Sequence, residues 1–266
     1  MQDRNRFPGV EAANGLLRIG HKGADAIVPG NTIASFEAAV AAGVDIIEFD
    51  VLRPRADFGQ PEAWKSAPGG PAHGSGPLLV AHDWASAARG DPPTLAKALD
   101  AFTRPPLDRV RFDLDLKVAG REDEIVSAVS ERGLLDRGMV SGMEVRGLRW
   151  LADNAPEVAL GWTIPRLTKD WRKQRGVALA VPAWRSYMHW RLPRIAREGA
   201  PNLGAWAVWV YHPLITRRLT DVTARAGVDV IAWTVDDPAR MAELAGLGVR
   251  GIVSNDPRLF SAVSPH

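Results

Sequence analysis

The amino-acid sequence predicts a protein of the α/β class whose fold is a (β/α)8 TIM barrel. Eight apolar segments of strand length are mostly separated by segments of helix length, and this alternation favours a parallel sheet. The length of 266 residues and the hydrophobic content of 46% suit a single closed barrel. Acidic residues and histidines recur at the C-terminal ends of the predicted strands, where such barrels hold their reactive groups. We therefore expect one domain over residues 1–266.

The first half of the chain begins with a strand and a capped helix. Asn31-Thr32 supplies the N-cap, and Gly43 stops the helix because glycine tolerates the backbone conformation that follows a helix end. A Pro/Gly-rich stretch, 53–77, predicts a flexible loop excursion from which the chain returns as a β-hairpin. The elements predicted here are strand 16–20, helix 33–42, strand 46–51, return strand 78–83 and helix 92–102.

The second half continues the alternation of strands and helices up to the C-terminus. The pattern places no helix boundaries in the stretch 164–204, which is long, basic and rich in tryptophan. The elements predicted here are strand 109–117, helix 122–132, strand 139–141, helix 144–152, strand 158–163, strand 205–211, helix 214–226, strand 228–235, helix 238–247 and strand 251–254.

Composition excludes several classes of function. The formal charge of +2 and the pI near 9.1 are compatible with a phosphate-containing substrate but too weakly basic to indicate a nucleic-acid partner. The absence of cysteine excludes disulfides, thiolate nucleophiles and Cys-ligated zinc. The polar N-terminus leads into no signal-peptide-like run, and no segment has the length of a transmembrane helix. We expect a cytoplasmic, soluble protein.

The strand 46–51 carries two carboxylates in an apolar setting. Side chains alternate along a strand, so Glu48 and Asp50 point to the same side while Ile47, Phe49 and Val51 point to the other. Adjacent buried acids repel each other and lose hydration, which is tolerable when a cation lies between them. Pairing with arginine or lysine at a strand end would satisfy them equally well.

Asp115 and Lys117 share one face of the strand 109–117. Together with Glu48 and Asp50, Asp115 would offer three carboxylates from neighbouring strands, a ligand set that suits a hard divalent metal, Mg²⁺ or Ca²⁺. The alternative is that the three acids form salt bridges with Lys117, Lys22 or Arg18. Spacing by itself does not decide between the two.

Two histidines, His21 and His82, each close a strand at the same predicted rim. Histidine is suited to proton transfer near neutral pH, so the pair could deprotonate an attacking group and protonate a leaving oxygen. Lys22 and Lys117 would offset the charge on phosphate oxygens. A single histidine at a strand end is more often structural, but two beside carboxylates favour a catalytic role.

These residues resemble the glycerophosphodiester phosphodiesterase family. The resemblance is carried by motifs that recur in the family's order along nearly the whole chain, which is more specific than any one of them. The motifs are His21-Lys22-Gly23, Asn31-Thr32 before a Phe36-containing helix, Ile47-Glu48-Phe49-Asp50-Val51, Val80-Ala81-His82-Asp83, Asp115-Leu116-Lys117, Trp233-Thr234-Val235-Asp236-Asp237 and 248–257.

The resemblance implies a (β/α)8 barrel that uses a divalent metal to hydrolyse glycerophosphodiesters to glycerol 3-phosphate and an alcohol. It implies attack by a neighbouring substrate hydroxyl or by water. The roles that it assigns are metal ligands Glu48, Asp50 and Asp115, an acid/base pair His21 and His82, and substrate or phosphate contacts from Lys22, Lys117 and Trp233.

Three positions depart from the family pattern. The family usually has arginine where this chain has Lys22, and glutamate where it has Gly30. The third ligand is usually glutamate, and here it is Asp115, one methylene shorter. If the first two side chains pair in the family, both have changed together, and lysine keeps the charge without the bidentate fork. Lys22 and Gly30 therefore leave open a weakened barrel that only binds a phosphorylated ligand.

The basic, aromatic segment 164–200 leaves a further alternative open. Basic residues interleaved with tryptophans suit weak contact with an anionic membrane surface, and the substrate would then be a lysophospholipid cleaved by a lysophospholipase-D-like activity. The more ordinary interpretation is a solvated helix pair whose tryptophans pack on the barrel.

Overall fold

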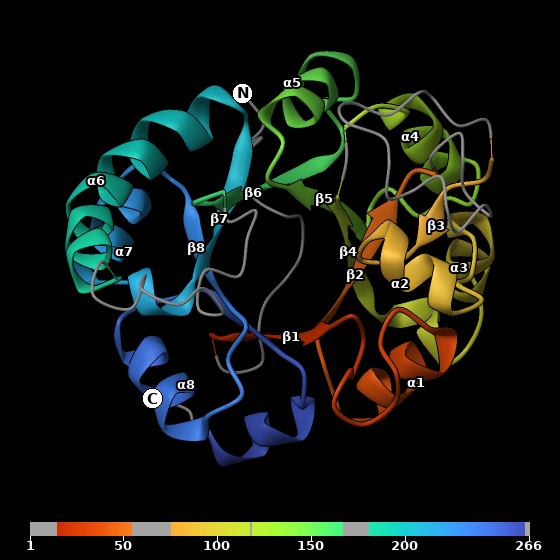
Figure 1. Ribbon diagram of the computed structural model, residues 1–266, viewed down its shortest axis with the longest axis horizontal. Helices are drawn as coiled ribbons and strands as arrows, with labels where there is room; N and C mark the ends of the chain where they lie inside the picture. Colours follow the sequence, from red (N-terminus) through yellow and green to blue (C-terminus); the bar gives the residue numbers. More distant parts are fainter. Residues whose placement is uncertain (1–14, 55–75, 118, 167–180, 264–266) are drawn as a thin grey trace.

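The strands form a closed parallel barrel. The computed structural model describes residues 15–54, 76–117, 119–166 and 181–263. Eight strands pair in parallel around the barrel, and pairing of β1 with β2 closes it (Figure 1). The strands are β1 (Leu17–His21), β2 (Ile46–Leu52), β4 (Arg111–Leu116), β5 (Gly138–Gly142), β6 (Ala159–Ile164), β7 (Ala205–Tyr211), β8 (Asp229–Trp233) and β9 (Gly251–Ser254). The predicted fold class is confirmed.

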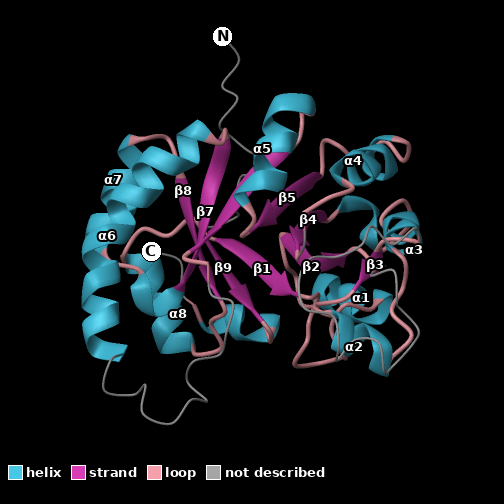
Figure 2. Ribbon diagram, turned by 45° about the horizontal axis from the view of Figure 1, so that its top comes forward, coloured by secondary structure: helices cyan, strands magenta, loops and turns pink. Residues whose placement is uncertain are grey.

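Helices surround the barrel and connect successive strands (Figure 2). The Thr32 side chain caps the first of them by accepting from the Ser35 amide, as predicted. The helices are α1 (Ile33–Ala41), α2 (Trp84–Arg89), α3 (Leu95–Ala101), α4 (Glu122–Ser130), α5 (Val145–Asn154), α6 (Val181–Asn202), α7 (Arg217–Arg225) and α8 (Pro238–Gly246), with 3₁₀ turns at Leu107–Arg109, His212–Leu214 and Pro257–Ala262.

The hairpin after β2 is present but short. Strand β3 (Leu79–Val80) pairs antiparallel with the end of β2, which confirms the predicted return. The predicted strand extends to Asp83, but Asp83 is instead the N-cap of α2, because its side chain accepts from the Ser86 amide. Helix α2 has no counterpart in the prediction. Most of the predicted excursion, residues 55–75, lies outside the described residues.

Apolar side chains fill two separate regions on the two faces of the sheet. One region lies inside the barrel and is formed by side chains of β1, β2, β5, β7, β8 and β9. Between sheet and helices, Phe49 and Phe112 meet Phe36 and Phe102 with ring centroids 4.8–6.2 Å apart. Burying one such side chain stabilises the fold by about 1.5–3 kcal/mol. Packing on both faces of the sheet therefore fixes the positions of the strands, and with them the polar side chains at the C-terminal strand ends.

Helix α6 accounts for part of the stretch whose helices the sequence pattern could not place. It is one helix of 22 residues, with Pro193 and Pro201 inside it. Residues 181–202 therefore form a single helix; the rest of the segment for which a helix pair was predicted, residues 167–180, lies outside the described part of the chain. In the described residues, no helix is both long enough and apolar enough to span a bilayer.

Candidate active site

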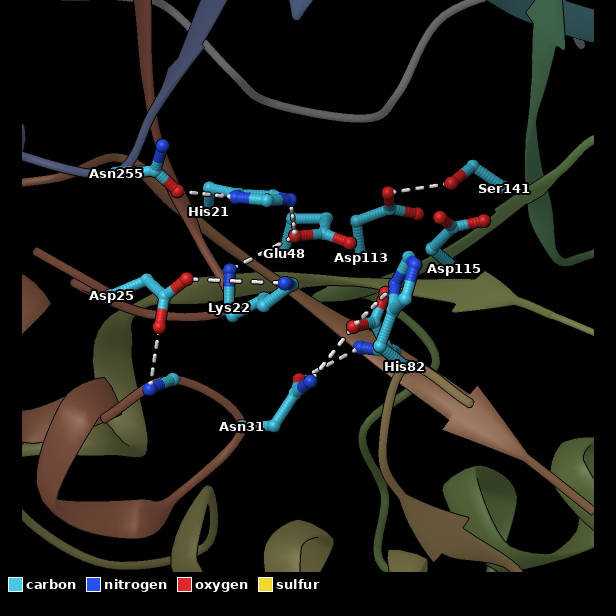
Figure 3. A network of polar contacts seen from close by, with 12 residues as sticks. His21, Lys22, Asp25, Asn31, Glu48, His82, Asp113, Asp115, Ser141 and Asn255 are labelled. Atoms are coloured by element: carbon cyan, nitrogen blue, oxygen red, sulfur yellow. Dashed lines mark hydrogen bonds and ion pairs between the residues drawn. The ribbon is translucent and has the colours of Figure 1, made fainter. Parts of the chain in front are cut away.

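Side chains from the C-terminal strand ends converge on one cavity. Alternation along each strand turns His21 of β1, Glu48 and Asp50 of β2, and Asp115 of β4 into the barrel mouth, with Lys117 just beyond β4 (Figure 3). The cavity, of about 170 Å³, is lined by His21, Glu48, His82, Asp115, Lys117, Ser141, Met143, Thr163, Trp209, Trp233, Thr234 and Val253.

The three acids predicted as metal ligands lie together. Glu48, Asp50 and Asp115 each offer a carboxylate oxygen, and these oxygens lie within 4.8 Å of one another. Register explains this grouping, since Asp50 of β2 lies directly beside Asp115 of β4. Glu48 and Asp50 are buried, and Asp115 is partly exposed to the cavity. The arrangement has the oxygen ligands that a hard divalent cation prefers.

Lys117 links two of these acids. Its Nζ lies 2.5 Å from Asp50 Oδ1 and 2.5 Å from Asp115 Oδ2. Asp50 Oδ1 accepts no hydrogen bond of good geometry, so its contact with Lys117 is an ion pair by distance only. Burial opposes both charges, but the carboxylates raise the pKa of Lys117 and the ammonium holds the pKa of Asp50 well below its usual range.

The alternative interpretation, in which the three acids form salt bridges with lysine or arginine, therefore holds for two of them, Asp50 and Asp115. Lys117 pairs with two of the acids, but Arg18 pairs with Asp45 at 2.8 Å and Lys22 lies nearest Asp25. Among the described residues, Glu48 forms no ion pair with a lysine or arginine side chain; its Oε2 accepts a hydrogen bond from the Lys22 backbone amide at 3.0 Å. Burial, and next the charge of Asp50, raise the pKa of Glu48 well above its usual range. A cation at this point would relieve that cost.

A chain of hydrogen bonds orients His21. Asn255 Nδ2 donates to Asp236 Oδ2 at 2.6 Å, so the amide oxygen of Asn255 faces His21 Nδ1, 2.6 Å away. That oxygen can only accept, hence Nδ1 carries the proton and Nε2 of the neutral ring holds a free lone pair. Nε2 lies 3.9 Å from Glu48 Oε2. Burial, and next the charge of Lys22, lower the pKa of His21, which favours the neutral ring.

His82 contacts Asp50, one of the three acids, from the exposed side of the site. Its Nδ1 lies 3.3 Å from Asp50 Oδ2, and its side chain is 53% exposed. Asn31 holds the same carboxylate from within: its Nδ2 donates to Asp50 Oδ2 at 2.7 Å, and its Oδ1 accepts from the Asp50 amide at 3.1 Å. Asn31 was predicted only as part of a helix cap, but it is the residue that fixes Asp50 (Figure 3).

Asp25 supplies the carboxylate that the family pattern places at position 30. Its Oδ2 lies 3.8 Å from Lys22 Nζ, and its Oδ1 accepts from the Gly30 amide at 2.8 Å. A Cβ at position 30 would lie 2.5 Å from Asp25 Oδ1, so glycine makes room for this acid. Lys22 therefore has an acidic neighbour, Asp25, although position 30 is a glycine.

The site also contains residues that the sequence analysis did not assign. Asp113 is fully buried beside Glu48 in the β2–β4 register and accepts from Ser141 Oγ at 2.7 Å. Burial raises the pKa of Asp113 well above its usual range. Asp25, Asp236 and Asn255 were also missed; only their place after strand ends could have indicated them. His212 accepts from Arg240 and is absent from the cavity lining.

The closed barrel and the groups at its mouth define a class of protein. Acids, histidines and lysines at the C-terminal strand ends are the arrangement of a TIM-barrel enzyme that acts on an anionic substrate.

Sequence comparison then identifies the family. The model of the glycerophosphoryl diester phosphodiesterase family matches residues 21–54 and 121–259, and the chain belongs to this family. The chain is 24% identical over 256 residues to YhdW of Bacillus subtilis, a candidate glycerophosphodiester phosphodiesterase, covering 90% of this chain and 94% of that protein. A stretch of 60 residues is 45% identical to glycerophosphodiester phosphodiesterase GDPD4 of Arabidopsis thaliana, covering 23% of this chain and 18% of that protein.

Solved structures share the fold. A phosphodiesterase of Oleispira antarctica, solved with its product sn-glycerol-3-phosphate, matches with a TM-score of 0.62 and 18% identity, covering 93% of this chain and 97% of that chain. A glycerophosphodiester phosphodiesterase of Agrobacterium tumefaciens matches with a TM-score of 0.65 and 18% identity, covering 93% and 100%. The family and the fold agree that this chain is a glycerophosphodiester phosphodiesterase.

Proposed function

We propose that this enzyme hydrolyses glycerophosphodiesters to glycerol 3-phosphate and an alcohol in a reaction that requires a divalent metal. The observation that carries the proposal is that one cavity at the barrel mouth is lined by two carboxylates, two histidines and Lys117, and that the buried Asp50 offers an oxygen within 4.8 Å of those of Glu48 and Asp115. A phosphodiester needs charge stabilisation, a base and an acid, and these side chains offer all three.

The donor set fits a hard cation. Glu48, Asp50 and Asp115 would hold Mg²⁺ or Ca²⁺, because their oxygens lie close together and Glu48 is buried without a lysine or arginine partner in the described part of the chain. When bound, the cation would stabilise negative charge on the phosphate and on the reacting oxygens.

His21 acts as the general base in this proposal. Its Nδ1 proton is held by Asn255, so Nε2 is free to take the proton of the attacking hydroxyl, whether that hydroxyl belongs to the substrate or to water. The attacking oxygen forms a bond to phosphorus, and the bond from phosphorus to the leaving alcohol breaks. Attack by water gives glycerol 3-phosphate directly; attack by the substrate hydroxyl gives a cyclic phosphate, which water then opens to glycerol 3-phosphate.

His82 acts as the general acid. Its Nδ1 lies 3.3 Å from Asp50 Oδ2, and its side chain is 53% exposed on the open side of the site, where the alcohol would depart. The proton that it donates neutralises the leaving alkoxide. Lys117 offsets the charge of the non-bridging oxygens, and Trp233 forms part of the cavity wall around the substrate. Lys22 is absent from the cavity lining and lies beside Asp25, so its charge would act on the phosphate from a longer distance.

The test is a panel of divalent metals and glycerophosphodiesters on the purified enzyme, with released glycerol 3-phosphate as the readout. We expect turnover only with added metal, and loss of at least about 10²-fold in kcat for His21→Ala and for His82→Ala. Undiminished turnover in excess chelator, or in both variants, would refute the mechanism.

A second candidate function concerns the outer face of α6. Trp184 packs partly on the core, as the ordinary interpretation predicts, but Trp190 is 62% exposed and Tyr187 51% exposed. Arg191 lies over the Tyr187 ring at 5.8 Å. Arg194 and Arg197 continue the three-to-four-residue spacing along the helix, and both pair with Glu198 at 3.1 Å, so the three arginines carry a net positive charge. This combination favours contact with an anionic membrane surface, from which a lysophospholipid could enter.

Liposome sedimentation tests this second function. We expect binding that requires anionic lipid, weakens with salt and falls in the double variant Tyr187→Ser/Trp190→Ser. The half-exposed Trp150 of α5, changed to serine, is the matched control. Absence of binding at low salt would exclude the membrane-surface function and leave the soluble diester as the substrate.

A further inference from the structure

The proposed general base works only if one particular ring nitrogen of His21 carries the proton. Nε2 must be free to accept a proton, so the neutral ring must hold its own proton on Nδ1. Glu48 Oε2 lies 3.9 Å from Nε2 and, as an acceptor, attracts a proton to the wrong nitrogen. The choice between the two forms therefore depends on the group that faces Nδ1, which is Asn255 at 2.6 Å (Figure 3).

An asparagine side chain does not by itself decide this choice. Its amide has an oxygen that accepts and an NH₂ group that donates, and a half turn of the amide exchanges the two. With the oxygen toward His21, Nδ1 carries the proton and Nε2 is free. With the NH₂ group toward His21, Nδ1 must accept and the proton moves to Nε2. A further residue must therefore hold the amide of Asn255 in one orientation.

Asp236 is that residue. It lies just beyond β8, and Asn255 follows the neighbouring strand β9. Asp236 Oδ2 accepts from Asn255 Nδ2 at 2.6 Å, and Oδ1 accepts from the Asn255 backbone amide and from Ser254 Oγ, each at 2.8 Å. A carboxylate can only accept hydrogen bonds, so every group that faces Asp236 must donate. The NH₂ group of Asn255 is thereby held toward Asp236 and its oxygen toward His21.

The backbone amide of Asn255 gives this line of hydrogen bonds its direction. A backbone N–H can only donate, and the chain here is held in place because the Asn255 carbonyl accepts from the Ala26 amide at 3.0 Å. The other members of the line can each reverse: an amide can turn, a hydroxyl can rotate and a histidine can exchange tautomers. Whatever occupies position 236 must therefore accept at the backbone amide, and the atom that it turns toward the Asn255 side chain decides the tautomer of His21.

We propose that Asp236 is a positioning residue that selects the catalytic tautomer of His21 through the side chain of Asn255. The proposal rests on the proposed function, in which His21 Nε2 takes the proton of the attacking hydroxyl. Neither Asp236 nor Asn255 lines the cavity, so the pair acts on the base and leaves substrate binding to other residues. Asp236 is itself exposed, and it therefore directs the tautomer without the cost of burying a charge.

Asp236→Asn tests the proposal, because it changes the chemistry of one atom and keeps the shape. The oxygen of the new amide stays at the Asn255 backbone N–H, so its NH₂ group faces the Asn255 side chain, whose amide must turn. We expect nitrogen-15 NMR of the metal-free protein to show the proton of His21 moved from Nδ1 to Nε2, with His21→Gln identifying the resonances. In Asp236→Ala, water can accept from Asn255 in place of the exposed carboxylate, and we expect the proton to stay on Nδ1. A purely structural role predicts the opposite order, with the isosteric variant milder than alanine.

Steady-state kinetics gives the second readout. We expect Asp236→Asn to lower kcat by about 10²-fold or more and to leave KM within about twofold, because the wrong tautomer cannot act as the base. The reciprocal variant Asp236→Asn/Asn255→Asp should recover the Nδ1 proton and the larger part of the lost kcat, since a carboxylate at position 255 accepts from both neighbours. The matched control is Asp237→Asn, the same change one residue on. Asp237 caps α8 by accepting from the Arg240 amide, a role that asparagine fills equally well.

Four results would overturn the proposal: a wild-type proton on Nε2, an Nδ1 proton in Asp236→Asn, a larger effect in Asp236→Ala than in Asp236→Asn, or no recovery in the reciprocal variant. The NMR readout needs neither metal nor substrate, so it separates this failure from that of the proposed function. If the wild-type enzyme hydrolyses glycerophosphodiesters but Asp236→Asn keeps its tautomer and kcat, only the role of Asp236 fails. If the tautomer moves as expected but no diester is hydrolysed with any metal, Asp236 does orient His21 and the proposed function fails.

Discussion

Removing the Lys117 ammonium should expose the charge imbalance of the acidic group. In Lys117→Met the packing of the side-chain stem is largely kept, but Asp50 and Asp115 lose the ammonium 2.5 Å away. Asp50 is fully buried and the Lys117 side chain is only 16% exposed, so solvent compensates little. Removing one partner of such a buried pair costs about 3–5 kcal/mol.

The free energy of unfolding, measured by urea titration in chelator, should fall by this amount. The corresponding decrease in Tm is about 6–20 °C, at roughly 2–4 °C per kcal/mol for a chain of this size. Saturating Mg²⁺ should recover much of the loss, because a bound cation replaces the missing positive charge. The control is Lys97→Met on the exposed face of α3, with an expected change within about 0.5 kcal/mol.

A loss below about 1 kcal/mol in chelator would show that the acids do not depend on Lys117. Equal losses with and without Mg²⁺ would show that the cation does not bind where the ammonium lies. Either result would refute the charge balance that underlies the metal site, and neither depends on catalytic activity.

Two further predictions concern the protonation of the site. Asn255→Ala should lower kcat by about tenfold or more with little change in KM, because the Nδ1 proton of His21 loses its hydrogen-bond acceptor. Asn255→Asp keeps an acceptor oxygen at this position and should retain a higher kcat than Asn255→Ala. An unchanged kcat in Asn255→Ala would refute the role of the His21–Asn255 hydrogen bond. Stabilisation by Mg²⁺, measured as an increase in Tm, should become larger from pH 5 to pH 8. The raised pKa of Glu48 means that the metal-free protein loses stability as pH rises, and metal binding requires the ionised carboxylate. A Tm increase that does not depend on pH would contradict this prediction.

The reactive groups could be predicted from the sequence because the direction of each side chain along a strand depends only on its position in that strand. Glu48 and Asp50 share a face through the two-residue period of a strand, and parallel strands in a barrel must bring their C-terminal ends to one rim. The same rules place His21, Asp115 and Lys117 there. The order of the family motifs along the chain identified the family, which no single motif could have done.

What the sequence could not provide is the set of partners that hold these groups. Asn255 lies 234 positions from His21, and only closure of the barrel by β1 and β9 brings them within 2.6 Å. Asp25 and Gly30 compensate each other through a steric contact of a loop, which has no periodic signature.

The sequence by itself determined the (β/α)8 barrel, its polar rim and the acids, histidines and lysines on it, because these depend on strand period and on the order of elements. The tertiary structure decided which of these charges meet. It also decided that His21 points Nε2 into the site and that Lys117 balances Asp50 and Asp115. Such facts depend on side-chain packing between strands that are distant in sequence, and packing is a property of the assembled barrel.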